Sequence, residues 1–145
     1  MKLPRGMTLI ELLTVTAIAS LVAAVAIPGY RIYLIRSQRS EAQLALLQLQ
    51  AAQEKYYLQY NLYTNDVTGS STATTPGLGL PGVTETGKYD IAVTTLGAGA
   101  QSYTATASPH ADGGQADDLQ CAGFTITDRG ERGINGSSTS ELCWK

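Results

Sequence analysis

Glu11 is the first residue of this chain whose position calls for a chemical explanation. It is the only charged residue among residues 7–27, a stretch in which 16 of 21 side chains are apolar. On insertion scales, a carboxylate at the middle of a membrane helix costs about 2.5–3.5 kcal/mol, and less near a helix end. An acid kept at such a position usually has a partner, so Glu11 is a candidate site residue.

A partner amine would arise from one proteolytic cut. Cleavage after Gly6 leaves the α-amino group of Met7 four residues before Glu11, at the same end of the helix. An α-amino group has a pKa of about 7.7–8 and is largely cationic at neutral pH, so it can offset burial of the carboxylate. If the amine belongs to a neighbouring helix, the pair also sets the register between two copies. The spacing therefore predicts an assembly device.

The element that positions Glu11 is predicted to be a helix long enough to cross a membrane. At about 1.5 Å per residue, residues 7–27 would form a helix of roughly 30 Å, and the short basic leader 1–6 precedes it. Two simpler explanations stay open at this point: a secretory signal cut after Ala26, and a one-pass anchor. Basic residues stand on both sides of the apolar stretch, so charge alone does not decide its orientation.

The helix is expected to continue past Pro28 to about Tyr60. Beyond the proline, apolar side chains recur at spacings of three, four and seven, as in an amphipathic helix: Ile32, Ile35, Ala42, Leu46, Leu49, Ala52 and Tyr56. One nearly continuous helix from about Thr8 to Tyr60 would be roughly 80 Å long. Pro28 has no backbone N–H to donate, so a kink is expected there.

The composition changes after residue 60, where 13 of the 15 glycines lie. Residues 66–87 are typical of a long irregular connection. Strands are expected at 89–94 and 103–107, with a turn at 97–99 between them, and a further strand within 122–127. Three or four short antiparallel strands have one apolar face to bury, and the helix stripe is its expected cover. The predicted fold class is α+β.

The composition gives little support to catalysis or cofactor binding. The net charge is −2, with one histidine and two cysteines, so neither a basic nucleic-acid surface nor a Cys/His metal cluster is predicted. His110 lies near Asp112, Asp117 and Asp118, but the spacing fits neither an EF-hand loop nor a zinc motif. We expect no catalytic residue, no metal site, no cofactor and no enzymatic activity.

Two further groups of side chains are expected to serve structure. The first contains the three arginines that follow the apolar stretch, which should solvate the helix outside the membrane or pair with acids in an assembly: Arg31, Arg36 and Arg39. The second contains tyrosines that should pack where the helix meets the sheet: Tyr56, Tyr57, Tyr60 and Tyr63.

The N-terminal residues carry a family resemblance. The run Gly6-Met7-Thr8-Leu9-Ile10-Glu11-Leu12-Leu13, with Ala26-Ile27-Pro28-Gly29-Tyr30 closing the apolar stretch, resembles the class III signal of bacterial type IV pilins and pseudopilins. The resemblance implies cleavage between Gly6 and Met7 by a prepilin peptidase, N-methylation of Met7, and a subunit-docking role for Glu11. Met7 departs from most relatives, which carry phenylalanine there.

The C-terminal residues carry a second, shorter resemblance. Cys121 and Cys143 lie where pilins place their C-terminal disulfide, and residues 129–133 with 143–145 are similar to minor pilins of the PilE class. A disulfide closing this loop would contribute on the order of 3 kcal/mol. The alternative, two reduced thiols in a cytosolic protein, fits less well with an export signal.

Together these resemblances imply a structural subunit of a type IV pilus, a minor pilin needed for pilus assembly and for pilus-dependent processes such as twitching motility. Residues 1–6 would be the leader, 7–29 the transmembrane and assembly helix, and 30–145 a periplasmic and then extracellular head. The implied partners are other pilin subunits, prepilin peptidase, the inner-membrane assembly machinery and, before assembly, membrane lipid. Two alternatives are a pseudopilin of type II secretion and a secreted ligand- or DNA-binding module cut after Ala26. Copy number, position in the fibre and the process served are left undecided by the residues.

Overall fold

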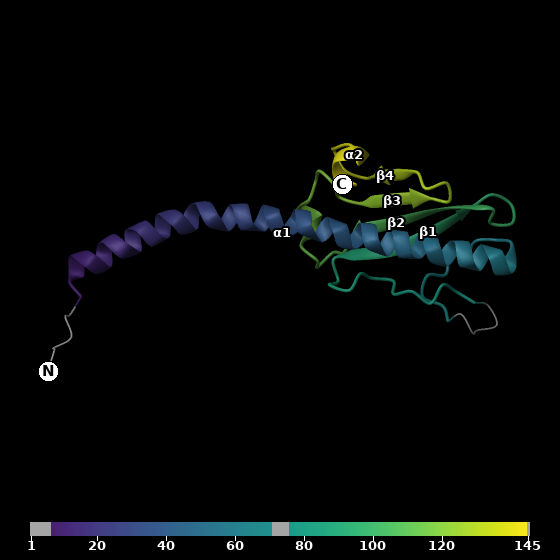
Figure 1. Cartoon of the computed structure of the whole chain (residues 1–145), viewed down its shortest axis with the longest axis horizontal. Coiled ribbons are helices and arrows are strands. Elements are labelled where there is room, and N and C mark those ends of the chain that lie inside the picture. The colour runs from purple at the N-terminus through teal and green to yellow at the C-terminus, as the bar shows by residue number, and fades with distance from the viewer. Residues whose placement is uncertain (1–6, 71–75, 145) are drawn as a thin grey trace. The chain divides into compact units, whose positions relative to one another are not determined.

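The computed structural model describes residues 7–70 and 76–144. Its elements are α1 (Leu9–Tyr60), β1 (Tyr89–Leu96), β2 (Ser102–Pro109), the 3-10 helix η1 (Gln115–Asp117), β3 (Phe124–Thr127), β4 (Arg132–Ile134) and α2 (Ser140–Cys143) (Figure 1). The chain divides after Arg36 into two compact units, and the second of them, from Ser37 on, contains the sheet. The α+β class predicted from the sequence is confirmed.

Helix α1 is 52 residues long and continues through Pro28 without interruption. It begins at Leu9, one residue after the expected start, and ends at Tyr60 as expected. Asn61, immediately after it, has a φ of 55°, and this left-handed conformation stops the helix. The predicted kink at Pro28 stays a prediction.

The sheet has four antiparallel strands in the order β1-β2-β3-β4, so each strand pairs with its neighbour in sequence. The strands β1 and β2 are eight residues each and pair along their whole length, from Tyr89 opposite Pro109 to Leu96 opposite Ser102. The turn between them uses Gly97 and Gly99, both with a φ near 80°, which a side chain would disfavour. The turn predicted at 97–99 is therefore confirmed.

One face of the sheet packs against α1 in the second unit. Ala42, Leu46 and Leu49 of the predicted helix stripe are fully buried against sheet residues such as Tyr103 and Phe124. The first member of the stripe, Ile32, is 53% exposed, so the prediction that the whole stripe is buried is wrong at that end. The reason is that Ile32 lies in the unit before Ser37, which holds no strand among its described residues.

The connection between α1 and β1 is irregular, as predicted, but it is tied down by its own backbone. The N–H of Leu78 donates to the carbonyl of Asp66, and the N–H of Leu80 donates to the carbonyl of Val67, each at 2.9 Å. Tyr63 and Val67 are buried in the core. The described part of this connection is therefore packed within the second unit. Residues 71–75 lie outside the described residues.

Candidate assembly sites

Glu11 lies in the first turn of α1 and forms a reciprocal cap with Thr8. The backbone N–H and the hydroxyl of Thr8 donate to one carboxylate oxygen of Glu11 at 3.4 and 3.5 Å, and the N–H of Glu11 donates to the Thr8 hydroxyl oxygen at 3.3 Å. This is a capping box, which satisfies two N–H groups that a helix start otherwise leaves unpaired. The threonine-x-x-glutamate signal is present in the sequence at residues 8–11, and the sequence analysis missed it.

The capping arrangement leaves Glu11 able to bind a further cation. A carboxylate accepts about four hydrogen bonds, and Thr8 uses one of the two oxygens. Glu11 also lies in the first turn of the helix, at the end where the backbone dipoles favour a negatively charged side chain. Gly6, the other side of the predicted cleavage point, lies outside the described residues.

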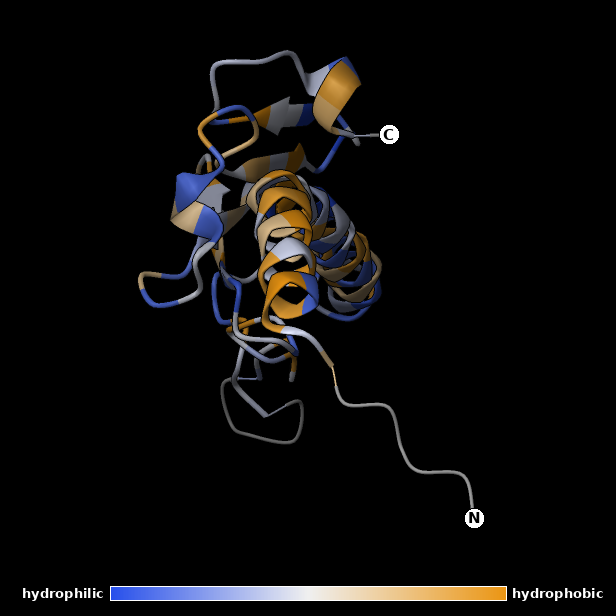
Figure 2. Cartoon of the chain, turned by 90° about the vertical axis from the view of Figure 1, so that its left-hand side faces the viewer, coloured by the Kyte–Doolittle hydropathy of each residue, from blue (hydrophilic) through white to orange (hydrophobic). Residues whose placement is uncertain are grey.

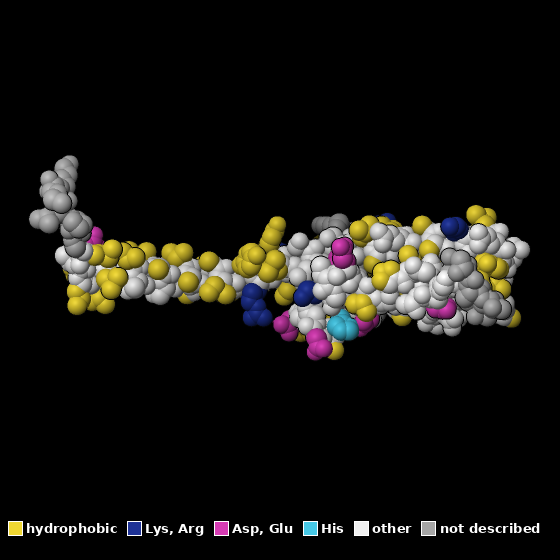
Figure 3. Space-filling model, turned by 90° about the horizontal axis from the view of Figure 1, so that it is seen from below, with side chains coloured by type: hydrophobic (Ala, Val, Ile, Leu, Met, Phe, Trp, Pro, Cys, Tyr) yellow, Lys and Arg dark blue, Asp and Glu magenta, His cyan; other side chains and the backbone are white. Residues whose placement is uncertain are grey.

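The first half of α1 presents apolar side chains that nothing in its own unit covers. Every large apolar side chain from Met7 to Tyr33 is between 53% and 76% exposed. Hydrophobic residues dominate this stretch in the view along the chain (Figure 2), and their side chains line the thin segment in the space-filling view (Figure 3). By length and composition, α1 contains a stretch that could cross a membrane.

The polar side chains inside this apolar stretch are satisfied by their own helix. The hydroxyls of Thr14, Thr16 and Ser20 each donate to a backbone carbonyl three or four residues earlier, at 2.9–3.0 Å. Hydroxyls bonded in this way carry no unsatisfied donor into lipid or into a bundle of apolar helices. Glu11 is thus the residue of this stretch that keeps binding capacity for a partner.

The predicted disulfide between Cys121 and Cys143 is confirmed, with the two Cα atoms 5.8 Å apart. Both cysteines are buried, and the amide of Gln43 on α1 donates to the carbonyl of Cys143 at 2.7 Å. Next to it, the indole N–H of Trp144 donates to the carbonyl of Gly133 on β4 at 2.9 Å. The C-terminus is therefore fastened to both the helix and the last strand.

Arg39 on α1 also holds the segment that leads to Cys121, through an ion pair with Asp118. Its guanidinium makes two parallel hydrogen bonds to the carboxylate of Asp118, at 2.7 and 2.8 Å, and Asp118 also accepts the N–H of Cys121. The side chain of Asp118 is only 3% exposed and that of Arg39 14%. The expectation that Arg39 would solvate the helix is wrong, because a buried carboxylate of its own chain holds it.

Replacing Arg39 by methionine should lower the free energy of unfolding of the second unit by about 2 kcal/mol, since a buried carboxylate then loses its cation. The measurement is urea unfolding of the full chain in detergent, followed by the fluorescence of Trp144, the only tryptophan. Arg129→Met, in the exposed β3–β4 turn, is the matched control and should change little. A loss below about 0.5 kcal/mol for Arg39→Met would contradict the role assigned to the pair.

His110 pairs with an acid of the sheet. Its Nδ1 atom lies 2.8 Å from the carboxylate of Asp90 on β1. Among the described residues, no group of three or more His, Cys, Asp or Glu side chains is placed to hold a metal ion.

Tyr57 and Tyr63 pack as predicted at the junction of helix, connection and sheet. The prediction is wrong for Tyr60, which is 43% exposed and contacts the ring of Tyr56 on the same helix. Tyr57 stacks on Tyr63 with ring centroids 4.7 Å apart, and Tyr63 meets the edge of Tyr103 at 4.8 Å. Burial raises the pKa of the Tyr103 hydroxyl, so that group stays neutral over the physiological range.

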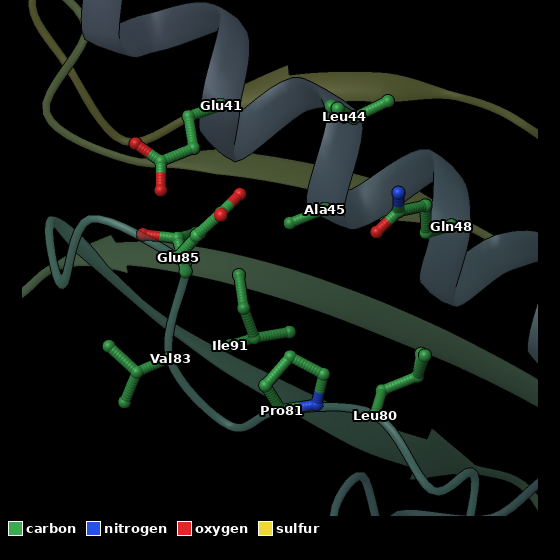
Figure 4. A pocket seen from close by; sticks show the side chains of 10 residues that line it. Glu41, Leu44, Ala45, Gln48, Leu80, Pro81, Val83, Glu85 and Ile91 are labelled. Carbon is green, nitrogen blue, oxygen red and sulfur yellow. The ribbon is translucent and has the colours of Figure 1, made fainter.

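A cavity of about 440 Å³ lies between α1 and the end of the connection. Glu41 and Glu85 face each other at one end of it, and Leu44, Leu80 and Ile91 contribute apolar walls (Figure 4). Burial tends to raise the pKa of Glu41, but hydrogen bonds from Thr86 and Thr84 and the positive charge of Lys88 together outweigh it, so the pKa lies below its usual value. The end of the cavity is therefore anionic at neutral pH, and no motif in the sequence predicts this feature.

Two models of known protein families match parts of this chain. The model of a family described as "Type IV minor pilin ComP, DNA uptake sequence receptor" matches residues 28–125, and that of the "Prokaryotic N-terminal methylation motif" matches residues 1–27.

Individual relatives are similar over part of their length. A type IV major pilin protein PilE of Neisseria gonorrhoeae is 40% identical over 76 residues, which are 52% of this chain and 46% of PilE. The major fimbrial protein FimA of Dichelobacter nodosus is 35% identical over 103 residues, covering 62% of this chain and 65% of FimA. For PilA of Myxococcus xanthus the identity is 41% over 61 residues, 42% of this chain and 28% of PilA. The chain thus spans less than half the length of the PilE relative.

Proposed function

Because this chain belongs to the type IV minor pilin ComP family, whose model matches two thirds of it, we propose that it is a structural subunit of a type IV pilus, acting in pilus assembly and in pilus-dependent processes such as twitching motility. The observation that carries the proposal is the long apolar surface of α1, uncovered in its own unit and marked at its start by one acid. Such a surface must be buried by lipid or by other subunits. The proposed role is structural, not enzymatic.

We propose that the chain first rests in the inner membrane, with the leader in the cytoplasm and the head in the periplasm. The disulfide supports this orientation, because disulfides persist in oxidising compartments. Prepilin peptidase then removes residues 1–6 and N-methylates Met7, and the assembly machinery draws the subunit into the fibre. The methylation motif that matches residues 1–27 supports these two steps.

In the fibre, Glu11 would accept the methylated amine of a neighbouring subunit. The apolar helices would surround that pair, and low local dielectric strengthens its attraction. Since amine and acid are four residues apart in each chain, pairing between chains displaces neighbours by about 6 Å along the helix axis. Repetition of one such unequal contact builds an open helical fibre instead of a closed dimer.

The quantity of this chain in sheared, purified fibres tests the proposal. We expect the chain to be present and its first residue to be N-methyl-Met7. A chain that starts at Ile27 and stays soluble would support the secreted module and exclude the pilus subunit. A trace amount relative to the principal fibre protein would support the minor-pilin assignment.

Gly6→Ala should strongly reduce leader removal, because a side chain next to the scissile bond crowds the peptidase site. The measurement is the ratio of uncleaved to cleaved chain in membranes, read by the mass of the N-terminal peptide. Leu3→Ala, also in the leader, is the matched control. Processing of Gly6→Ala at the rate of the unaltered chain would reject the cleavage site.

A second candidate function is DNA binding, favoured by the family description, which names a DNA uptake sequence receptor. Exposed Arg129 and Arg132 in and after the β3–β4 turn could contact phosphates, although the net charge of the chain is −2. Titration of the full chain with labelled duplex DNA at two salt concentrations tests this. Binding that weakens as salt rises supports it, and no binding at low salt rejects it.

A type II secretion pseudopilin is the less favoured alternative, because the family model and the relatives named above are pilins and fimbrial proteins.

A further inference from the structure

The cavity beside α1 is built to accept a cation attached to an apolar stem. Its ten lining side chains include two carboxylates, of Glu41 and Glu85, and no basic group. The two carboxylates lie at the same end, while Leu80 and Ile91 line the part that leads away from them (Figure 4). Lysine and arginine have this construction: an aliphatic stem that packs on apolar surface and a charged head.

The carboxylate of Glu41 is placed to bind the charged group of such a side chain. Its two carboxylate oxygens already take the N–H of Thr86 at 2.8 Å and the hydroxyl of Thr86 at 2.6 Å. Each oxygen keeps a further acceptor position, and the carboxylate is held in one orientation, so little side-chain entropy is lost when a cation binds. Glu85 is exposed and can turn to the same cation.

The chain itself presents a basic side chain of the required kind on α1. Arg36 is exposed, and among the described residues no hydrogen bond or ion pair is found for it. Tyr33, one turn earlier on the same side of the helix, is 68% exposed. An arginine beside an uncovered aromatic ring is a surface that suits burial against another protein.

The axial positions of these groups match the displacement that docking at Glu11 requires. A neighbour moved by four residues, about 6 Å, brings its residue 36 level with residue 40 of this chain. That level is one residue, about 1.5 Å, from Glu41. Counted in residues along α1, both ion pairs therefore call for nearly the same offset between neighbouring subunits, four residues for one pair and five for the other.

We propose that this cavity receives a basic side chain from the helix of a neighbouring pilin subunit, as this chain presents Arg36 to its own neighbour. The inference rests on the proposed function as a pilus subunit and adds a second contact to it, between the helix of one subunit and the head of the next. The pair of acids selects neighbours with a basic residue at that level.

Photo-crosslinking in assembled fibres tests the contact. The photoreactive amino acid p-benzoylphenylalanine replaces Val83, which lines the cavity and carries no charge, so both acids stay in place. The cells are irradiated, and the crosslinked peptides from sheared fibres are identified by mass spectrometry. We expect crosslinks to the helix segment around residue 36 of a neighbouring subunit, either a copy of this chain or another pilin with a basic residue there. The matched control carries the same group at Ala98, in the β1–β2 turn.

Ala98 is a suitable control because its turn lies beside the far end of α1, where the N–H of Tyr63 donates to the carbonyl of Ala100. That level is about 20 residues, or roughly 30 Å, from the predicted contact. Crosslinks from position 83 to any other segment, or none in fibres that contain the chain, would overturn the inference and leave the pilus function intact. Absence of the chain from fibres would instead overturn the proposed function.

Charge reversal gives a second, independent readout. Glu85→Lys should reduce the amount of chain retained in sheared fibres several-fold, because two cations would then face each other. Glu131→Lys, an exposed acid in the β3–β4 turn, makes the same change in net charge and should have no effect. Equal retention of both variants would count against the cavity as a contact site.

Discussion

Replacement of Glu11 by alanine should reduce the chain in sheared fibres at least tenfold while leaving leader removal unchanged. In the proposed fibre, the carboxylate neutralises the amine of a neighbouring Met7 among apolar helices. Removing one member of a buried ion pair costs about 3–5 kcal/mol, and about 1.4 kcal/mol corresponds to a factor of ten. Processing should persist, because in the proposed sequence of events the peptidase cuts between Gly6 and Met7 before the subunits meet.

The capping role of Glu11 must be separated from its charge. Glutamine at this position can keep the hydrogen bonds with Thr8, since a capping box uses either glutamate or glutamine, but it carries no charge. If the ion pair matters, Glu11→Gln should lower incorporation nearly as much as Glu11→Ala. Normal incorporation of the glutamine variant would show that only the cap is needed, and normal incorporation of both would reject the docking role.

Removal of the disulfide by Cys121→Ser with Cys143→Ser should destabilise the head by about 3 kcal/mol. The bridge joins residues 22 apart in sequence, so it restricts the conformations of the unfolded chain. Without the bridge, the unfolded chain gains conformational entropy and the folded state is less favoured. Both replacements also place a hydroxyl where a buried sulfur lay. Urea unfolding of the full chain in detergent measures the loss, with Trp144, next to Cys143, as the fluorescent probe.

The matched control for the disulfide is the unaltered chain treated with a reductant and an alkylating agent in denaturant, then refolded. It should lose a similar amount of stability, since the same constraint is absent. A loss below about 1 kcal/mol in the serine variant would mean that Arg39–Asp118 and the bonds of Gln43 and Trp144 hold the C-terminus without the bridge. An intact fold with free thiols in the native chain would contradict the observed pairing.

The parts of this protein that sequence reasoning predicted well are those that repeat locally. The buried residues Ala42, Leu46 and Leu49 of α1 follow from helical periodicity. The end of α1 at Tyr60 follows from Asn61, a residue type that tolerates the left-handed conformation it adopts here. The turn at Gly97–Gly99 follows from the freedom of glycine at positive φ. The strand boundaries were less accurate: β1 continues to Leu96, two residues past the expected end, because pairing with β2 extends it.

Some of the site residues were likewise predictable from local sequence, and others were not. The isolated acid at Glu11 is visible in the sequence, because a charge within an apolar stretch stands out without any fold. The cleavage point before Met7 stays a prediction. The cap from Thr8 was not predicted, although the threonine-x-x-glutamate signal for it stands at residues 8–11. By contrast, Arg39 looked like one more solvated arginine until its partner was known.

The sequence by itself determined the long helix, the apolar stretch with its single acid and the small sheet, because hydropathy and turn preferences act between residues close in the chain. Only the tertiary structure decided that Arg39 binds Asp118, 79 residues away, and that Glu41 binds Thr86, 45 residues away. It also decided that Glu85 joins Glu41 at one end of a cavity. These contacts depend on how the connection and the C-terminal segment fold back onto α1, and no local pattern specifies that path.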